Sequence, residues 1–407
     1  MKNRPVQADF GATIRACFAG YVVQAIVNNF VPLLFITFHR EFGIPLSRIT
    51  LLVTFNFGLQ LLIDLCSVFL VDRLGYRVCA VLAHVFSASG LLLLTILPAL
   101  LPDAFTGILI SVTLYAVGGG LLEVLISPIV EACPTDNKET QMSLLHAFYC
   151  WGHVAVVLFS TLFFFLFGIS QWKILALLWA LLPILNGIAF TRVPIRTLAE
   201  EHGIDDAPLK NILSTGTFWL FFLLMICSGA SEQAVSQWAS TFAEMSLGVS
   251  KSIGDLAGPM AFGVLMGLSR TLYGKFGEKI PLVRFMIAST LLCILSNLLI
   301  SLSGIPALSL LGCALTGLSV GIMWPGTFSL SSANIRGGGT AMFALLALAG
   351  DVGCMGGPTL AGFVAGAFGD NLHLGILCSI VFPSLMLVGL IRVFHWERSS
   401  RAEKQKA

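Results

Sequence analysis

The sequence predicts an all-α integral membrane protein with twelve membrane-spanning helices. Of its 407 residues, 57% are apolar and only 11% are Asp, Glu, Lys or Arg, whereas about 25% of the residues of an ordinary soluble domain are charged. The mean hydropathy is +0.91. So few charges cannot cover the surface of a folded chain of this length. A water-soluble protein is therefore excluded, and the chain is expected to lie in a lipid bilayer.

Twelve apolar runs are long enough to cross a bilayer, since a helix needs about 20 predominantly apolar residues to span the hydrocarbon core. Charges or Pro and Gly turns separate these runs. In the first half of the chain the expected spans are 12–38, 46–71, 78–100, 105–131, 141–168 and 173–191. In the second half they are 213–239, 252–272, 281–303, 306–330, 339–368 and 372–394.

A polar segment divides the spans into two sets of six. Residues 192–211, RVPIRTLAEEHGIDDAPLKN, form the longest polar stretch and carry both charge signs. A coarse repeat supports the division, because VDRLGYR (71–77) follows the second span and YGKFGEK (273–279) follows the eighth. We therefore expect two pseudo-symmetric six-helix bundles. The expected parts are an N-terminal bundle over 1–191, a linker over 192–211, a C-terminal bundle over 212–394 and a basic tail over 395–407.

The distribution of basic residues predicts the orientation of the chain. With the N-terminus in the cytoplasm, 19 of the 23 Lys and Arg residues fall on the cytoplasmic side, and Arg40, Arg48, Lys173 and Lys251 fall outside. Short cytoplasmic loops carry such an excess. We expect a multi-pass protein of the plasma or inner membrane with both termini cytoplasmic. The formal charge of +2 is dispersed along the chain, which argues against a nucleic-acid partner.

The cysteine spacing and the lack of a phosphate-binding pattern argue against an enzyme or a cofactor site. The ten cysteines are spread almost evenly, with no Cys-x-x-Cys pair and no His at zinc spacing, so neither a metal site nor a disulfide framework is expected. The phosphate-binding pattern Gly-x-x-x-x-Gly-Lys-Ser/Thr is absent, which argues against an ATP-driven pump. We expect no enzymatic activity and no cofactor.

The loop VDRLGYR resembles the signature loop of the major facilitator superfamily of transporters, Gly-x-x-x-Asp-Arg-x-Gly-Arg/Lys. The matching residues are Asp72, Arg73, Gly75 and Arg77, whereas Val68 replaces the opening Gly. At a cytoplasmic helix end, Asp72 and Arg73 can pair with charges of the other half and latch the outward-open state. The alternative is that Arg73 and Arg77 only set the topology, although Asp has no part in that rule.

Several spans also resemble the fucose–proton symporter family within this superfamily. The matching stretches are GGGLLEVLISPIVE (118–131), SLLHAFYCWG (143–152), SEQAVSQW (231–238), WPGTFSLS (324–331) and GGPTLAG (356–362). Arg270 is similar to an Arg of that family in the eighth span. The resemblance implies transport of a sugar or a related solute by proton symport. One departure concerns the mechanism, because the family has Asn-Asp in the first span where this chain has Asn28-Asn29.

Four carboxylates lie deep within the expected spans, namely Asp64, Glu123, Glu232 and Asp351. An ionisable group near the bilayer centre costs about 2.5–3.5 kcal/mol on insertion scales and is retained mainly where it faces a cavity or a partner. Each is a candidate proton carrier, because a carboxylate can bind and release a proton as a cavity hydrates and dries. Glu123 is the foremost candidate, since three glycines precede it and let another helix or a ligand approach.

The other three carboxylates have competing interpretations. Glu232 is as well placed for solute contact as for proton transfer, with Gln233 and Gln237 near it. Asp351 either replaces the missing carboxylate of the first span or pairs with a structural donor. Asp64 shares one helix face with Asn56 and Gln60 at four-residue spacing. That spacing favours a seam of interhelical hydrogen bonds over a site.

Uncharged polar residues on the helix faces suit a solute with many hydroxyl groups, because they donate and accept hydrogen bonds without a counter-charge. The candidates are Gln24, Asn28, Asn29, His146, Tyr149 and His153. The alternative for each is interhelical hydrogen bonding. Trp238 and Trp324 can stack on a sugar ring, although Trp238 near a helix end also fits the aromatic belt of the membrane interface.

Together these features predict a secondary active transporter in which two six-helix halves alternate access to a midplane site. The expected partners are a small sugar-like solute, a proton and the lipid bilayer, and the protein is expected to act as a monomer. Carboxylates and amides also coordinate sodium, so the coupling ion stays open. Two alternatives are a proton-coupled exporter of drugs or metabolites and a membrane sensor that transports nothing.

Overall fold

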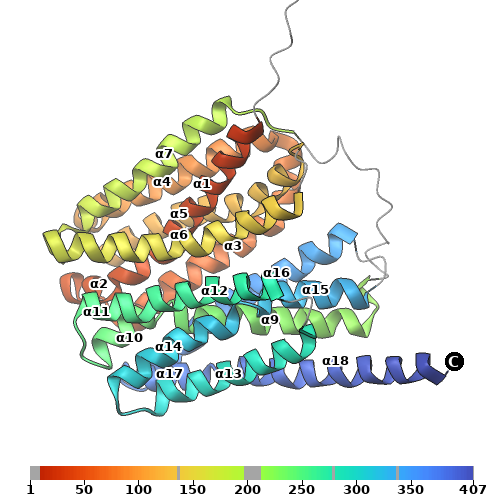
Figure 1. Cartoon of the computed structure of the whole chain (residues 1–407). Coiled ribbons are helices and arrows are strands. Elements are labelled where there is room, and N and C mark those ends of the chain that lie inside the picture. The colour runs from red at the N-terminus through yellow and green to blue at the C-terminus, as the bar shows by residue number, and fades with distance from the viewer. Residues whose placement is uncertain (1–9, 135–137, 197–211, 277–279, 336–338, 407) are drawn as a thin grey trace, which may run out of the picture. The chain divides into compact units, whose positions relative to one another are not determined.

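The computed structural model describes residues 10–134, 138–196, 212–276, 280–335 and 339–406 (Figure 1). Every regular element within these ranges is helical. Twelve segments are long and apolar enough to cross a membrane, and the first and last of them are Phe10–Phe42 and Leu372–Trp396. The predicted class, an all-α protein with twelve membrane-spanning helices, is confirmed. The greater part of the expected linker, residues 197–211, lies outside the described residues.

The six spans of the first half, numbered 1 to 6 along the chain, are built from seven α-helices and two short 3₁₀ turns. The elements are α1 (Phe10–Asn29), η1 (Val31–Leu34), α2 (Phe35–Phe42), α3 (Leu46–Leu74), α4 (Tyr76–Leu100), α5 (Ala104–Glu131), α6 (Lys138–Phe167), η2 (Ile169–Gln171) and α7 (Trp172–Arg192). Gly75 links α3 to α4 with a φ of 80°. A residue with a Cβ atom rarely adopts this conformation, so the tight turn needs glycine here.

Spans 7 to 12 form the second half of the chain. Their elements are α9 (Gly216–Ser236), α10 (Ala239–Met245), α11 (Lys251–Asp255), η4 (Leu256–Met260), α12 (Ala261–Phe276), α13 (Leu282–Leu302), α14 (Pro306–Val320), α15 (Met323–Asn334), α16 (Gly339–Ala367), α17 (Leu372–Cys378) and α18 (Val381–Lys406). Spans 1, 7, 10 and 12 are each interrupted between two helices, and span 8 contains the single π-helical turn η4. Interrupted spans expose backbone polar groups, which are tolerated where protein or a cavity surrounds them.

The described chain separates into two compact units. Of the described residues, the first contains 10–30, 59–134, 138–156 and 170–196, and the second contains 31–58, 157–169 and those from 212 onward. Two segments of the first half thus belong to the unit of the second half. One comprises η1, α2 and the beginning of α3, and the other is the end of α6. The division of the sequence into two six-helix bundles, over 1–191 and 212–394, remains a proposal.

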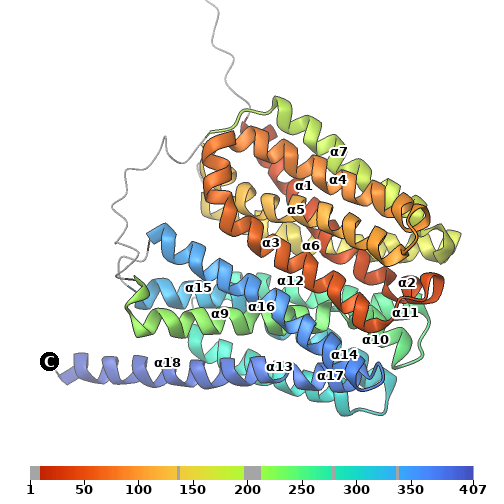
Figure 2. The same cartoon turned by 180° about the vertical axis from the view of Figure 1, so that it is seen from behind.

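In the first unit, α4 lies beside both α5 and α7, and α1 packs on α5 and α7 (Figure 2). The core follows the apolar side chains of α5, among them Leu122, Leu125, Ile126 and Ile129, which pack against Cys79 and other buried residues. α5 approaches α4 closely at Gly118, where an added Cβ atom would clash with Ser87 and with the carbonyl oxygen of Ala83. Glycine is therefore what allows these two backbones to touch.

In the second unit, α9 and α16 run side by side, and α13 packs on α14 and α18 (Figure 1). Glycines again bring the backbones together, because a Cβ atom at Gly229 would clash with the carbonyl oxygen of Gly350. Large apolar side chains remain exposed over the described spans, for example Phe165 on α6, at 74% exposure, and Val388 on α18, at 67%. This exposure fits a protein whose solvent is hydrocarbon.

The close approach at Gly118 gives a test of helix packing. We expect Gly118→Ala to lower the stability of the purified protein by about 1–3 kcal/mol, the usual cost of forcing an extra group into a packed interface. Thermal unfolding in detergent measures it. Gly356→Ala is the matched control, because a Cβ atom there meets no described heavy atom within 4 Å and alanine is the better helix former. Equal destabilisation of the two variants would contradict the assigned contact.

Candidate functional site

Glu123 lies in a group of polar side chains contributed by α1, α3 and α5 of the first unit. Gln24 Nε2 donates a hydrogen bond of 2.7 Å to Glu123 Oε2. One turn along α1, Asn28 Oδ1 accepts a hydrogen bond of 2.9 Å from Gln60 Nε2 of α3. Gln24, Asn28 and Gln60 are buried. The candidate coupling residue and the predicted amides of the first span therefore form one connected region.

Small residues of α5 make this convergence possible. A Cβ atom at Gly119 would lie 3.0 Å from Val27 of α1, and one at Gly120 would lie 3.0 Å from Ile63 of α3. The glycines directly before Glu123 thus let α1 and α3 approach α5 closely enough for Gln24 and Gln60 to reach their partners. The sequence prediction that this glycine run permits a close approach agrees with the packing.

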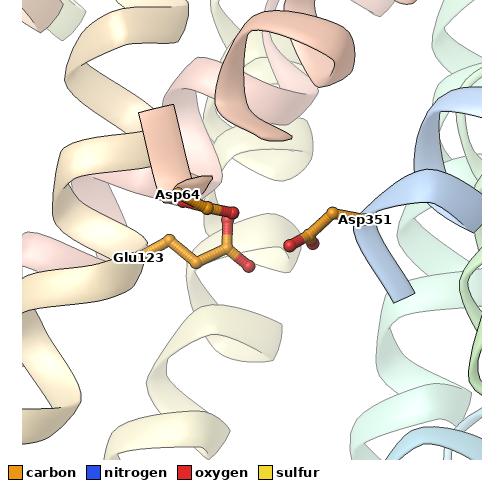
Figure 3. Close-up of side chains that lie close together, drawn as sticks. All are labelled: Asp64, Glu123 and Asp351. Atoms are coloured by element: carbon orange, nitrogen blue, oxygen red, sulfur yellow. The ribbon is translucent and has the colours of Figure 1, made fainter. Parts of the chain in front are cut away.

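Asp64 supplies a second carboxylate beside Glu123. Their carboxylate oxygens lie within 4.8 Å of each other, and Figure 3 shows the two groups facing each other from neighbouring helices. Two carboxylates at this separation repel each other unless a positive charge or a proton lies between them. Asp64 therefore belongs with Glu123 in a two-carboxylate pair, an arrangement that its spacing from Asn56 and Gln60 alone did not predict.

The two asparagines of the first span have different partners. Asn28 connects to Gln60 of α3, whereas Asn29 Nδ2 donates to the carbonyl oxygen of Ala25, one turn back on its own helix. Both are buried. The hydrogen bond of Asn29 lies at the end of α1, directly before the interruption at η1, and such a bond to the backbone stabilises a helix end.

Polar residues of the second unit form a chain along α9. Glu232 Oε2 lies 3.7 Å from Arg270 Nη2 of α12, and Glu232 Oε1 accepts a hydrogen bond of 3.1 Å from Gln233. Gln237 Nε2 in turn donates to Gln233 Oε1 at 3.1 Å. Arg270 Nε also donates to the carbonyl oxygen of Gly321, 3.1 Å away, at the interruption of span 10.

Arg270 is a candidate gating residue. Its guanidinium lies against the carboxylate of Glu232 and donates to the carbonyl oxygen of Gly321. These contacts group Arg270 with the candidate solute-contact residues of α9. They also mean that the carboxylate of Glu232 has a counter-ion, while one hydrogen-bond donor to Glu123 is the neutral amide of Gln24.

The two candidate tryptophans differ in their surroundings. Trp238 is fully buried, its indole Nε1 donates to the carbonyl oxygen of Pro358 at 2.9 Å, and its ring lies 5.4 Å from that of Phe35. It packs the interior rather than a membrane interface, so the aromatic-belt interpretation is wrong. Trp324 of α15 is partly exposed and covers Gly350 of α16, directly beside the buried Asp351.

The remaining predicted residues have the following places. His153 is buried on α6, and Tyr149 packs on the core of the first unit. Arg73 is exposed, whereas Arg77 Nη1 donates to the carbonyl oxygen of Phe190 at 2.9 Å and so ties the turn at Gly75 to the end of α7. Asp351, labelled in Figure 3, belongs to α16 of the second unit. The side chains of Asp72 and His146 lie outside the described residues.

A serine motif in α14 carries no hydrolase chemistry. GLSVG at 317–321 matches the pattern Gly-x-Ser-x-Gly, which in α/β hydrolases forms a sharp turn between a strand and a helix. Here Ser319 is buried in the last turn of α14, where no strand precedes it, and it donates to the carbonyl oxygen of Thr316 at 2.7 Å. The serine is therefore a helix-packing residue.

Twelve membrane-spanning helices, interrupted spans and polar groups buried at membrane depth are the features of a membrane transporter. The chain belongs to the Major Facilitator Superfamily, whose family model matches residues 16–358. This is a family of transporters and not of enzymes. The predicted superfamily is confirmed. A comparison with curated proteins found no match.

Solved transporter structures share the fold at low sequence identity. A variant of the E. coli fucose:proton symporter is 16% identical, with a TM-score of 0.63 over 93% of this chain and 97% of that one. A bacterial homologue of the human lysosomal transporter Spinster is 14% identical, with a TM-score of 0.74 over 95% and 97%. A D-xylose–proton symporter is 14% identical, with a TM-score of 0.73 over 94% and 96%.

The Arg270–Glu232 pair makes a prediction about stability. We expect Arg270→Gln to lower the free energy of unfolding by about 1–3 kcal/mol, because it leaves a largely buried carboxylate without its counter-ion. The double variant Arg270→Gln/Glu232→Gln should recover most of the loss, since two amides can bond to each other. Thermal unfolding checks both, with Arg392→Gln on the exposed face of α18 as the control. Additive losses in the double variant would contradict the pairing.

Proposed function

We propose that this transporter moves a sugar or another small polar solute together with a proton by alternating access. The observation that carries the proposal is the group formed by Glu123, Asp64 and Gln24 inside the first unit. A pair of half-buried carboxylates at membrane depth is costly, and a role in ion coupling accounts for its retention. The names of two structural neighbours, a fucose:proton and a D-xylose–proton symporter, support the proposal.

The coupling step follows from the electrostatics of the pair. Glu123 and Asp64 repel each other strongly when both are ionised, so binding of one proton, which lowers the charge of the pair from −2 to −1, relieves this repulsion. The proton enters from one side as a carboxylate becomes a carboxylic acid, and it leaves on the other side when the acid ionises in a hydrated pathway. Gln24 orients Glu123 by donating to one of its oxygens. Asp64 thus supplies a carboxylate that Asn28-Asn29 cannot.

Solute contact is assigned to the amide, carboxylate and aromatic groups of both halves. In the first half these are Gln24, Asn28, Asn29, His146, Tyr149 and His153. In the second half they are Glu232, Gln233, Gln237, Trp238 and Trp324, and Arg270 pairs with Glu232. Amides and a neutralised carboxylate–guanidinium pair recognise hydroxyl groups through paired donors and acceptors, and an indole face packs on the apolar face of a sugar ring. This donor set favours a neutral polyhydroxylated solute.

The arrangement in the membrane completes the proposal. We assign both termini to the cytoplasm of a cell that carries the protein in its plasma or inner membrane, because 19 of the 23 basic residues then lie on that side. Asp72, Arg73, Gly75 and Arg77 are assigned to the cytoplasmic turn that helps the halves to open and close. The transport unit is proposed to be a single chain.

Uptake by proteoliposomes tests the solute and the ion. We expect an inward proton gradient to drive accumulation of at least one of radiolabelled fucose, xylose and glucose, because symport couples the two fluxes. If a sodium gradient drives uptake without a pH gradient, the coupling ion is sodium and not a proton. Outward movement of a lipophilic dye without sugar uptake would favour the exporter, and the absence of any flux would favour a sensor.

Replacement of Glu123 tests the proton carrier. We expect Glu123→Gln to abolish accumulation, so that the internal and external solute concentrations become equal, while counterflow exchange continues because solute binding is retained. Asp64→Asn should weaken accumulation in the same way. Glu131→Gln, at the end of the same helix α5, is the charge-matched control and should accumulate normally. Unimpaired accumulation by Glu123→Gln would remove Glu123 from this role.

A further inference from the structure

A buried ion pair lies at the beginning of span 8, away from the groups described above. Lys251 Nζ is 3.0 Å from Asp255 Oδ2, four residues along the chain, and the carboxylate is fully buried. The loop before span 8 follows seven membrane crossings, so it lies on the side opposite the N-terminus. We call this the far side. Lys251 is predicted to lie on this side from the distribution of basic residues, whereas Asp255 is not predicted as a functional residue, although opposite charges at a spacing of four residues were the available signal.

Both members of the pair contact the end of span 7. Ser240 Oγ of α10 donates to Asp255 Oδ1 at 2.5 Å. Lys251 Nζ also lies 3.4 Å from Glu244 Oε1 of the same helix. Glu244 in turn lies 3.7 Å from the guanidinium of Arg40 on α2. Lys251 and Asp255 therefore keep Glu244 and Ser240, which belong to the second half of the chain, as polar partners even when the first-half segments move away.

Two further contacts join the pair to segments of the first half. Lys251 Nζ donates to the carbonyl oxygen of Leu33 at 2.6 Å, within the interruption of span 1. Thr161 Oγ1, near the end of span 5, donates to Asp255 Oδ2 at 3.4 Å. All these residues belong to the second compact unit. One lysine and one aspartate thus hold spans 1 and 5 against spans 7 and 8.

A seam of contacts that joins spans 1 and 2 to spans 7 and 11 continues from these residues. Phe35 packs on Trp238 at 5.4 Å between ring centroids. Thr54 Oγ1 of α3 lies 2.7 Å from Thr359 Oγ1 of α16, and a Cβ atom at Gly362 would clash with Thr50. Spans 1 and 2 are therefore closed against spans 7 and 11 at the same end of the unit.

We propose that Lys251 and Asp255 form a latch that closes the far side of the transporter through Leu33 and Thr161. Opening on that side requires the first-half segments to leave, which breaks the bonds to the Leu33 carbonyl and the Thr161 hydroxyl. Because Lys251 and Asp255 remain paired with each other and with Ser240, no charge is left alone when the latch opens. The latch is therefore a reversible closure, whereas an isolated buried charge would be too costly to expose and rebury.

Crosslinking across the seam tests the latch. In a background in which the ten native cysteines are replaced, Thr54→Cys and Thr359→Cys place two thiols where the hydroxyl oxygens are 2.7 Å apart. Oxidation with copper phenanthroline in proteoliposomes, without solute, then measures the fraction closed on the far side. We expect Lys251→Met to reduce that fraction at least about twofold by shifting the population toward far-side opening.

Two further variants secure the interpretation. Lys251→Met/Asp255→Asn leaves no unpaired charge, so it should fold normally and still lose crosslinking; a crosslinked fraction equal to that of the parent would overturn the latch. Lys173→Met removes a lysine of the same side whose ammonium lies over the Trp172 ring at 5.5 Å, and it should crosslink like the parent. Because the readout uses no solute or ion gradient, its result is independent of the proposed sugar and proton coupling.

Discussion

A polar group inside a bilayer must find its partner within the protein, because hydrocarbon offers none. This constraint accounts for the contacts that matter most in the described chain. Gln24 bonds to Glu123, Gln60 bonds to Asn28, Arg270 faces Glu232, and Lys251 faces Asp255. Each joins two spans or fixes the end of one. For the apolar side chains of each span, contact with lipid and contact with another helix differ little in free energy. The polar contacts therefore specify which helix faces meet.

Glycine is the second requirement, since polar side chains can reach each other only where the backbones approach. The run from Gly118 to Gly120 brings α5 against α4, α1 and α3, and Gly229 with Gly350 brings α9 against α16. Glu123 and Asp351 each follow such a glycine within a few residues. The packing that gives the fold its cohesion therefore also positions the carboxylates, which is why stability and coupling are expected to respond to changes in the same helices.

The polar contacts fall into two kinds with different tasks. Glu123 and Asp64 are two acids with a neutral amide donor, so their total charge changes when a proton binds. Lys251 and Asp255 form an ion pair whose contacts to Leu33 and Thr161 respond to movement of the first-half segments. The proposed proton coupling needs a group that changes charge, and the proposed closure of the far side needs a group whose contacts break and form again. The interruptions of spans 1 and 10 contribute backbone carbonyls, at Leu33 and Gly321, to basic partners.

The sequence by itself determined the twelve spans, the polar division between two sets of six and the short group of carboxylates deep within the spans, because the hydrophobic cost of crossing a bilayer is summed locally along each span. It also indicated the superfamily through the turn at Gly75. Only the tertiary structure decided that Asp64 faces Glu123, that Arg270 faces Glu232 and that Trp238 packs in the interior. These pairings join residues far apart in the chain, and they depend on where glycines let helices meet, which span-by-span hydropathy does not encode.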